Sequence, residues 1–266
     1  MGQKLPLPEQ VRITAAAGYD AIEPWIRDIE QYVQSGGSLA DLRKQIADAG
    51  LTVESAIGFA NWIVDDDDQR RAGLEQLRRD MDLVRQIGGA RIAAPPAGAS
   101  RPESPQLDLF AAAKRYRAAL EIGHEIGVTP QAEVWGHSRN LSRLGETVFV
   151  AVESGHPDAC ILPDIYHIYR GGSDFAGLKL LSGAAVHVFH VNDYPTNVPR
   201  EELNDALRVY PGDGDAPLAE IVSSLRATGF QGVLSLELFN RELWQQDPLE
   251  VAKRGLESVQ RMISLA

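Results

Sequence analysis

Side chains that could do chemistry recur at the ends of apolar segments in the second half of the chain. They are Glu133 in "AEVW", Asp164 and His167 in "LPDIYH", His190 in "FHVND" and Glu237 in "LELFN". Carboxylates and imidazoles bind divalent cations and transfer protons. Three carboxylates that converge in one pocket repel each other unless a cation lies between them. The pattern therefore predicts a metal site held by Glu133, Asp164, His190 and Glu237.

The composition of this ligand set indicates the kind of metal. Carboxylate oxygens with a single imidazole suit Mn²⁺, with Mg²⁺ and Co²⁺ as alternatives, better than a structural zinc, which prefers thiolates. Cys160 is the only cysteine, so the sequence offers no thiolate cluster. Taken singly, a strand glutamate is often a buried partner of an arginine and a strand histidine is often a core residue. The expectation of a Mn²⁺ cofactor therefore depends on the whole set.

The segments that carry these residues belong to a regular alternation along the chain. Short apolar or β-branched runs alternate with stretches of helical periodicity, which is typical of βα units with a parallel sheet. The expected strands are 19–25, 51–59, 90–96, 128–135, 159–168, 185–193 and 232–240. One expected helix runs from a cap at Ser38 to a stop at Gly50, and another follows a cap at Asp215.

Seven such units predict an α/β fold, a (β/α)₈ TIM barrel. An open doubly wound sheet usually has fewer units and a glycine-rich nucleotide turn, and that turn is absent here. The first expected helix begins at Pro8, so the first barrel strand is expected to be missing or abbreviated. No linker or change of composition divides the chain, and a single domain over 1–266 is expected. Barrel enzymes place their active sites at the carboxyl ends of the strands, where the polar residues fall.

Charge and composition exclude several classes of partner. The 266 residues carry a formal net charge of −11, which repels nucleic acids and anionic membranes. The chain shows neither an apolar run of about 18 residues nor the apolar core of a secretion signal. We therefore expect a soluble, cytoplasmic protein that binds a small molecule, with neither a nucleic acid nor a membrane as partner.

Tryptophans provide a separate indication of the ligand. Trp25, Trp62, Trp135 and Trp244 lie at or just beyond expected strand ends. Aromatic faces stack well on sugar rings, although any single tryptophan could instead plug the barrel or form a subunit contact. We expect Trp25, Trp62 and Trp135 to contact a polyol or a cyclic keto-sugar.

The ordered Glu, Asp-x-x-His, His and Glu series resembles that of the xylose-isomerase-like TIM barrels. This family includes sugar phosphate isomerases/epimerases, ketose 3-epimerases, hydroxypyruvate isomerase and inosose dehydratase. The resemblance extends from "AAAGYDAIEPW" to "LEVAKRGLESVQRM". It implies that Glu133, Asp164, His190 and Glu237 are metal ligands after the fifth to eighth strands, and that Glu133 and Glu237 are also the catalytic bases.

The same resemblance implies roles for two further residues. His167, three residues after the aspartate, and Arg208, in "RVYPGDGD", are expected to bind substrate oxygens. Relatives commonly self-associate, so a homodimer or homotetramer is a possible assembly. The segment between His190 and Arg208 is longer than in compact epimerases.

These observations predict a divalent-metal-dependent isomerase or epimerase of a sugar or keto-sugar. The metal would make a hydrogen next to a carbonyl acidic and stabilise the enediolate that remains. The alternative is a lyase or dehydratase that uses the same site on a keto-inositol or a 3-keto-glycoside. A third possibility is a sugar-binding protein without catalysis. A DNA-repair endonuclease on this barrel is disfavoured, because the chain has only six histidines and a negative charge.

Overall fold

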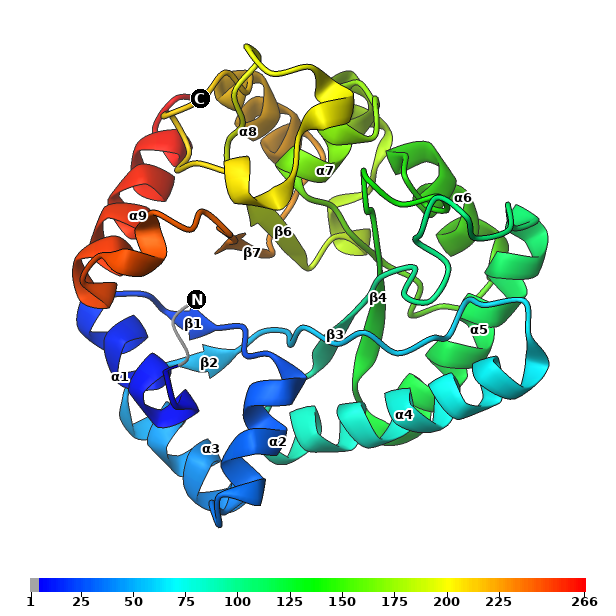
Figure 1. The fold of residues 1–266 in the computed structure, drawn as a ribbon, viewed down its shortest axis with the longest axis horizontal. Coiled ribbons are helices and arrows are strands. Elements are labelled where there is room, and N and C mark those ends of the chain that lie inside the picture. The colour runs from blue at the N-terminus through cyan, green and yellow to red at the C-terminus, as the bar shows by residue number, and fades with distance from the viewer. Residues whose placement is uncertain (1–4) are drawn as a thin grey trace.

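The structure, a computed structural model, describes residues 5–266. Helices form the outside of a ring and short strands line its inside (Figure 1). In these residues the strands are β1 Ala21–Ile22, β2 Thr52–Val53, β3 Arg91–Ala94, β4 Thr129–Glu133, β5 Ile161–Leu162, β6 Val188–Val191 and β7 Val233–Leu236. The α-helices are α1 Leu7–Ala17, α2 Ile26–Gln34, α3 Leu39–Asp48, α4 Asp67–Gln86, α5 Leu109–Ile126, α6 Leu144–Glu153, α7 Ile165–Arg170, α8 Leu218–Ala227 and α9 Pro248–Ile263.

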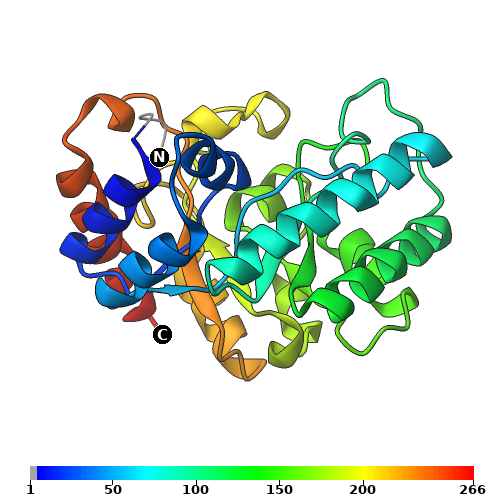
Figure 2. The ribbon, with the colours of Figure 1, turned by 90° about the horizontal axis from the view of Figure 1, so that it is seen from below.

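Short 3₁₀ turns occupy the longer connections of the second half. They are η1 Phe175–Leu180, η2 Gly183–Ala185, η3 Arg200–Glu202, η4 Asp205–Leu207 and η5 Leu243–Gln245. In the side view of Figure 2, the yellow segment with η3 and η4 lies at the upper edge and the C-terminus lies at the lower edge. The β6–α8 connection therefore extends over one end of the ring.

The strands pair in parallel, as βα units require. The ladders are β1 with β2, β3 with β4 and β5, and β6 with β7. Single parallel bridges extend the pairing between β5 and β6, at Ile161 with Val186 and at Asp164 with His190. The second bridge already places two expected metal ligands side by side.

The expected strands are all present, and each is shorter than predicted. The largest error is the run 159–168, where β5 ends at Leu162 and the helix α7 begins at Ile165. The cause is Asp164, whose carboxylate accepts a hydrogen bond from the backbone nitrogen of His167 at 2.8 Å and caps this helix. An aromatic, apolar sequence therefore becomes a strand end followed by a helical turn.

The two expected helix caps have different outcomes. The Ser38 hydroxyl accepts from the backbone nitrogen of Asp41 at 3.3 Å, and Gly50 follows α3 with a φ of 75°, so this helix is confirmed. The expected cap at Asp215 is wrong. Its carboxylate accepts instead from the backbone nitrogen and the hydroxyl of Thr196, at 2.7 and 2.9 Å, and α8 begins after Pro217 without a side-chain cap.

The expectation of a missing or short first strand concerns the chain before α1. Residues 1–4 lie outside the described part of the structure, and the next two residues, Leu5 and Pro6, belong to no strand. The strands β7 and β1 are linked by side chains, because the Ser235 hydroxyl donates to Glu23 Oε2 at 2.7 Å.

Apolar side chains fill the barrel below the strand ends. Ile57, Ala93, Leu162 and Val188 form a small buried cluster, against which Trp25 and Val233 pack. A larger core lies between the strands and the outer helices. The polar residues at the strand ends therefore lie above a filled apolar interior. Within residues 5–266, no helix combines the length and apolarity needed to cross a membrane.

Candidate active site

Three of the four predicted metal ligands come together. Asp164 follows β5, His190 lies in β6 and Glu237 follows β7, and one ligand atom from each lies within 4.8 Å of the others. His190 Nδ1 is 3.8 Å from Asp164 Oδ2 and 3.6 Å from Glu237 Oε2. The parallel pairing of three consecutive strands produces this arrangement, because it brings their carboxyl ends to one edge.

The imidazole of His190 presents one nitrogen to this cluster and binds a carboxylate with the other. Its Nε2 lies 3.0 Å from Glu23 Oε2, and its buried Nδ1 has no hydrogen-bond partner. A carboxylate accepts only from an N–H, so Nε2 carries a proton. In the neutral form of the ring, which is the form that binds a metal, the lone pair is on Nδ1. Metal-binding histidines are commonly oriented in this way by a carboxylate on the far nitrogen. The donor set of His190, Asp164 and Glu237 therefore fits a divalent cation.

The charges around His190 are strongly coupled. Burial by itself would lower the pKa of His190, but the Glu23 and Glu237 carboxylates outweigh it and raise that pKa to about 10, so the imidazole is charged as long as no cation replaces the proton on Nδ1. Burial would raise the pKa of Glu23, but His190 and the hydrogen bonds to its carboxylate lower it. Burial raises the pKa of Glu237, and His190 and Arg208 oppose this shift.

Arg208 lies in the middle of the site, where its guanidinium contacts several acids. Its Nη1 donates to Asp164 Oδ2 at 2.9 Å and to Glu237 Oε2 at 2.7 Å. Its Nη2 donates to Asp205 Oδ1 at 2.7 Å and lies 3.0 Å from His167 Nε2. Burial opposes the charged form, but Asp164, Glu237 and Asp205 raise the pKa of Arg208, which stays charged. The expected substrate-binding arginine is thus at the site, held by three carboxylates.

Glu133 lies at the end of β4 and is buried, but its carboxyl group is outside the cluster of Asp164, His190 and Glu237. Burial raises the pKa of Glu133 to about 8, with further contributions from Glu237 and Asp164, against the effect of His190. Near neutral pH this group is largely protonated. A buried carboxyl group with a pKa near the working pH has the property expected of a general acid or base.

His167 is buried next to Arg208, as the resemblance implies for a substrate-binding residue. Burial, and then Arg208, hold the pKa of His167 well below its usual value, so the ring is neutral. Its Nε2 accepts from Arg208, which leaves the proton on Nδ1, and this buried Nδ1 has no partner. The ring therefore retains one unused donor.

The tryptophans divide into two groups. The Trp25 ring lies 5.2 Å from that of Phe59 and 6.1 Å from that of Phe239, and Phe59 lies 5.9 Å from Trp135. Trp135 in turn lies 6.4 Å from the His167 ring, so this aromatic group borders the polar cluster. Trp62 belongs to a different group: its ring lies 5.6 Å from that of Tyr116, its side chain is fully buried, and its indole nitrogen donates to the Pro95 carbonyl at 2.8 Å, so its expected substrate contact stays a prediction.

The sequence reasoning missed several residues of the site. Glu23 follows β1 and stood within an expected strand, so the strand-end rule would have found it. Asn192 was one of the polar residues expected at a strand end but had no role assigned to it; it follows β6 and donates from Nδ2 to Asp164 Oδ2 at 3.0 Å. His137 and Asp205 come from connecting segments, and no periodicity of the sequence points to them.

Comparison with known proteins places this arrangement in a family. The family described as "Xylose isomerase-like TIM barrel" matches residues 11–262. A 3-dehydroshikimate dehydratase of Pseudomonas putida is 26% identical over 262 residues, which are 95% of this chain but only 39% of that protein. An inosose isomerase of Bacillus velezensis is 25% identical over 97% of this chain and 92% of its own length.

A solved structure gives the same fold. The crystal structure of the IOLI protein with a bound zinc atom superimposes with a TM-score of 0.88 at 20% identity, over 98% of this chain and 94% of the other. The predicted fold class is therefore confirmed. Relatives of the chain are named as isomerases, epimerases and dehydratases. This chain belongs to the xylose isomerase-like TIM barrel family.

Proposed function

We propose that the chain is a divalent-metal-dependent isomerase or epimerase of a sugar or keto-sugar, with Glu133, Asp164, His190 and Glu237 as the metal ligands. One observation carries this proposal. The buried Nδ1 of His190 has no hydrogen-bond partner, lies 3.8 and 3.6 Å from the Asp164 and Glu237 carboxylates, and belongs to a ring that Glu23 orients through Nε2. A core histidine of purely structural function would have both nitrogens paired.

A divalent cation held by these residues supplies a Lewis acid that stabilises negative charge on substrate oxygens. The protein supplies the proton transfers. Glu237 is the base that removes the proton beside the carbonyl. Arg208 donates to its Oε2 at 2.7 Å and His190 Nδ1 lies 3.6 Å away, and both contacts oppose the effect of burial on its ionised form. Glu133, the other carboxyl group of the ligand set, then delivers a proton. Delivery to the opposite face of the same carbon gives an epimer, and delivery to the neighbouring carbon gives an isomer.

Other residues bind and orient the substrate in this proposal. The unused Nδ1 donor of His167 binds a substrate oxygen. Arg208 donates to Glu237 Oε2 and also binds a substrate oxygen. Trp25 and Trp135 offer ring faces to the carbon skeleton, together with Phe59 and Phe239. The substrate is a small sugar or polyol, in keeping with the names of the relatives.

The identity of the metal is part of the proposal. One imidazole with carboxylate oxygens suits Mn²⁺, Mg²⁺ or Co²⁺. The zinc atom of the IOLI structure adds Zn²⁺ to these ions, and a site with a free position for substrate accommodates it as well. Elemental analysis of the protein as purified identifies the ion.

A lyase is the second proposed function, and a specific observation favours it. The 3-dehydroshikimate dehydratase of Pseudomonas putida matches 95% of this chain, and a dehydratase can use the same base. Once Glu237 has removed the proton, loss of a leaving group two carbons from the carbonyl replaces reprotonation. Glu133 in its protonated form is suited to deliver a proton to the departing oxygen.

Proton exchange in D₂O distinguishes the two functions. The metal-loaded protein is incubated with ketoses, inososes, 3-keto-glycosides and 3-dehydroshikimate, and products are followed by NMR. Deuterium in recovered substrate and product, without loss of water or aglycone, supports the isomerase or epimerase. Release of water or aglycone supports the lyase. Full turnover of Glu237→Gln, or full turnover of the metal-free protein, would contradict both.

A further inference from the structure

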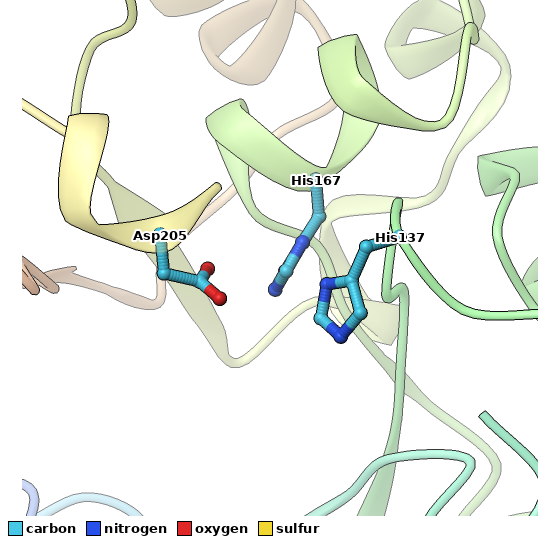
Figure 3. Close-up of side chains that lie close together, drawn as sticks. All are labelled: His137, His167 and Asp205. Atoms are coloured by element: carbon cyan, nitrogen blue, oxygen red, sulfur yellow. The ribbon is translucent and has the colours of Figure 1, made fainter. Parts of the chain in front are cut away.

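The surroundings of His190 differ between its two ring nitrogens. On the Nδ1 side, Arg208 bonds the ligand carboxylates, and its Nη2 lies 2.7 Å from Asp205 Oδ1 and 3.0 Å from His167 Nε2. Figure 3 shows Asp205 and His167 directed toward each other across this space, from η4 and α7. The Arg208 guanidinium therefore completes the pairing there. On the Nε2 side, the partner of the ring is Glu23, which follows β1.

Glu23 makes its printed bonds through one oxygen. Its Oε2 accepts from the Ser235 hydroxyl at 2.7 Å and lies 3.0 Å from His190 Nε2. Its Oε1 is buried without a hydrogen-bond partner. The last torsion of a glutamate side chain is broad, so bonds to a single oxygen do not fix the plane of the carboxylate. A donor for Oε1 would fix it.

Ser55 lies beside Glu23 on the neighbouring strand. The β1–β2 ladder ends at Ile22, and one further parallel bridge follows, three residues later on the first segment and four residues later on the second. Two residues, one of them Glu23, thus face three residues, of which Ser55 is the middle one. Burial would raise the pKa of this glutamate, but His190 and then two hydroxyls, of Ser235 and Ser55, lower it. Ser55 is therefore the donor available to Oε1.

Gln131 of β4 reaches Ser55 across β3. Its Nε2 donates to Ser55 Oγ at 3.1 Å, and both side chains are fully buried. Gln131 is in register with Ala93 of β3, whose backbone nitrogen donates to the Ala56 carbonyl at 2.8 Å. Because Ala93 carries only a methyl group, the longer side chain of Gln131 can extend over it. The bond therefore links β4 to the residues that follow β2.

The direction of these hydrogen bonds follows from the groups involved. An amide nitrogen only donates, a carboxylate only accepts, and a hydroxyl has one proton to donate. Since Ser55 accepts from Gln131, its proton is free for Glu23. With the amide turned round, Ser55 would donate to Gln131 and present a lone pair to the carboxylate. The negative charge of Glu23 thus favours a chain of donors that runs from Gln131 through Ser55 to Glu23.

We propose that Ser55 and Gln131 are positioning residues for the metal site at His190. They fix the Glu23 carboxylate, and this carboxylate orients the His190 ring with Nδ1 toward the cation. A ring that is already oriented loses less freedom when the metal binds, so the chain raises metal affinity without touching the cation. This role presupposes the proposed function, because it acts on the proposed metal site.

Metal affinity tests this role without any activity assay. The metal-free full chain is titrated with Co²⁺, with the absorption spectrum as one readout and competition with a chromogenic chelator as the other. Ser55→Ala removes the donor to Glu23, and affinity should fall by about 3- to 10-fold, less than for a residue that contacts a ligand directly. Gln131→Met keeps the length of the side chain without its hydrogen bond, and affinity should fall by a smaller factor.

A double-mutant comparison separates this role from a loss of packing. If Ser55 acts through Glu23, Ser55→Ala should cause no further loss in the Glu23→Gln variant, within about twofold. A general disturbance of the fold would lower affinity in both backgrounds. Ser258→Ala is the matched control and should bind Co²⁺ as the wild type does. Ser258 is equally buried, but its hydroxyl donates to the Gly255 carbonyl at 2.7 Å within α9.

Urea denaturation of the metal-free protein confirms that each variant is folded, and Gln131→Met decides the test if Ser55→Ala does not fold. Unchanged affinity in these two variants would overturn the positioning role. An equal loss from Ser55→Ala with and without Glu23→Gln would overturn it as well. Both results would leave the metal site in place. A wild type that binds no Co²⁺ would instead contradict the proposed function, and the positioning role with it.

Discussion

Two buried polar clusters of the barrel differ in how their atoms are paired. In the first, the Tyr116 hydroxyl of α5 lies 2.8 Å from the carbonyls of Pro130 and Cys160, and the backbone nitrogens of Ala132 and Cys160 donate to it at 3.3 and 3.4 Å. The second, which we call the His190 cluster, consists of Asp164, His190 and Glu237 with the neighbouring Glu23, Arg208 and His167. In it, His190 Nδ1, His167 Nδ1 and Glu23 Oε1 are buried without a hydrogen-bond partner.

The difference separates a cluster that stabilises the fold from one that binds a ligand. The Tyr116 hydroxyl joins two strands to a helix, and burial raises its pKa further, so it stays neutral. The His190 cluster carries several charges and leaves hydrogen-bonding atoms unused, at a cost to stability of about 1–3 kcal/mol for each buried unpaired group. Such a cost is expected where a ligand completes the pairing.

The largest effect is expected when Glu237, the proposed catalytic base in the His190 cluster, is replaced. Glu237→Gln keeps the shape of the side chain but removes both the proton acceptor and a charged metal ligand. Turnover should fall by about 10²–10⁴, and metal affinity should fall with it. Steady-state kinetics at saturating metal and a metal titration measure the two effects. Unchanged turnover would remove Glu237 from the mechanism.

A smaller effect is expected one step further from the metal. Glu23→Gln replaces the carboxylate that orients His190 through Nε2 at 3.0 Å. An uncharged partner no longer fixes the tautomer as firmly, and metal affinity should fall by about 10–100-fold. Competition with a chromogenic chelator measures this affinity. Ser235→Ala, which removes one hydrogen bond to Glu23 and keeps its charge, is the matched control and should have a weaker effect.

The sequence predicted the His190 cluster better than its surroundings. Strand periodicity located all seven strands, and parallel strands bring their carboxyl ends together, so Asp164, His190 and Glu237 could be grouped without coordinates. Trp62 shows the limit of this rule, because a position near a strand end does not decide whether a side chain faces the pocket or the core.

Residues on connections could not be predicted in this way. His137 reaches its place because Gly136 packs on α7, and Asp205 because Arg208 binds its Oδ1. Both depend on contacts between segments far apart in the sequence, which no local pattern records. The cap at Asp164 was missed for a related reason, since the same residue ends a strand, begins a helix and faces the site.

A substitution in the Tyr116 cluster should lower the stability of the fold and leave metal binding unchanged, the opposite of what we expect for the His190 cluster. Tyr116→Phe leaves the Pro130 and Cys160 carbonyls and two backbone N–H groups with fewer partners in a buried site, and the free energy of unfolding should fall by about 1–3 kcal/mol. Urea denaturation of the metal-free protein measures this change. Metal affinity should stay within about twofold of the wild type, and a large loss would show that the two clusters are coupled.

The smallest effect is expected at Asp80 on α4, a buried carboxyl group outside both clusters. Burial, and then Glu30, raise the pKa of Asp80 to about 6, and its Oδ2 has no partner. This value lies above the usual pKa of about 3.9, so the folded protein retains the proton in that window and loses stability as the pH rises from about 4 to 6. Asp80→Asn should therefore stabilise the protein at pH 8 by roughly 1 kcal/mol, with part of the full effect screened by solvent and by Arg79. The gain should shrink at pH 5, where the wild-type carboxyl group is mostly protonated. Urea denaturation at the two pH values measures this gain, and an equal gain at both would mean that packing, not charge, is responsible.

Asp80 also sharpens the contrast between the clusters. A buried acid without neighbouring ligands only destabilises the fold, whereas Asp164 and Glu237 have an imidazole beside them with which to share a cation.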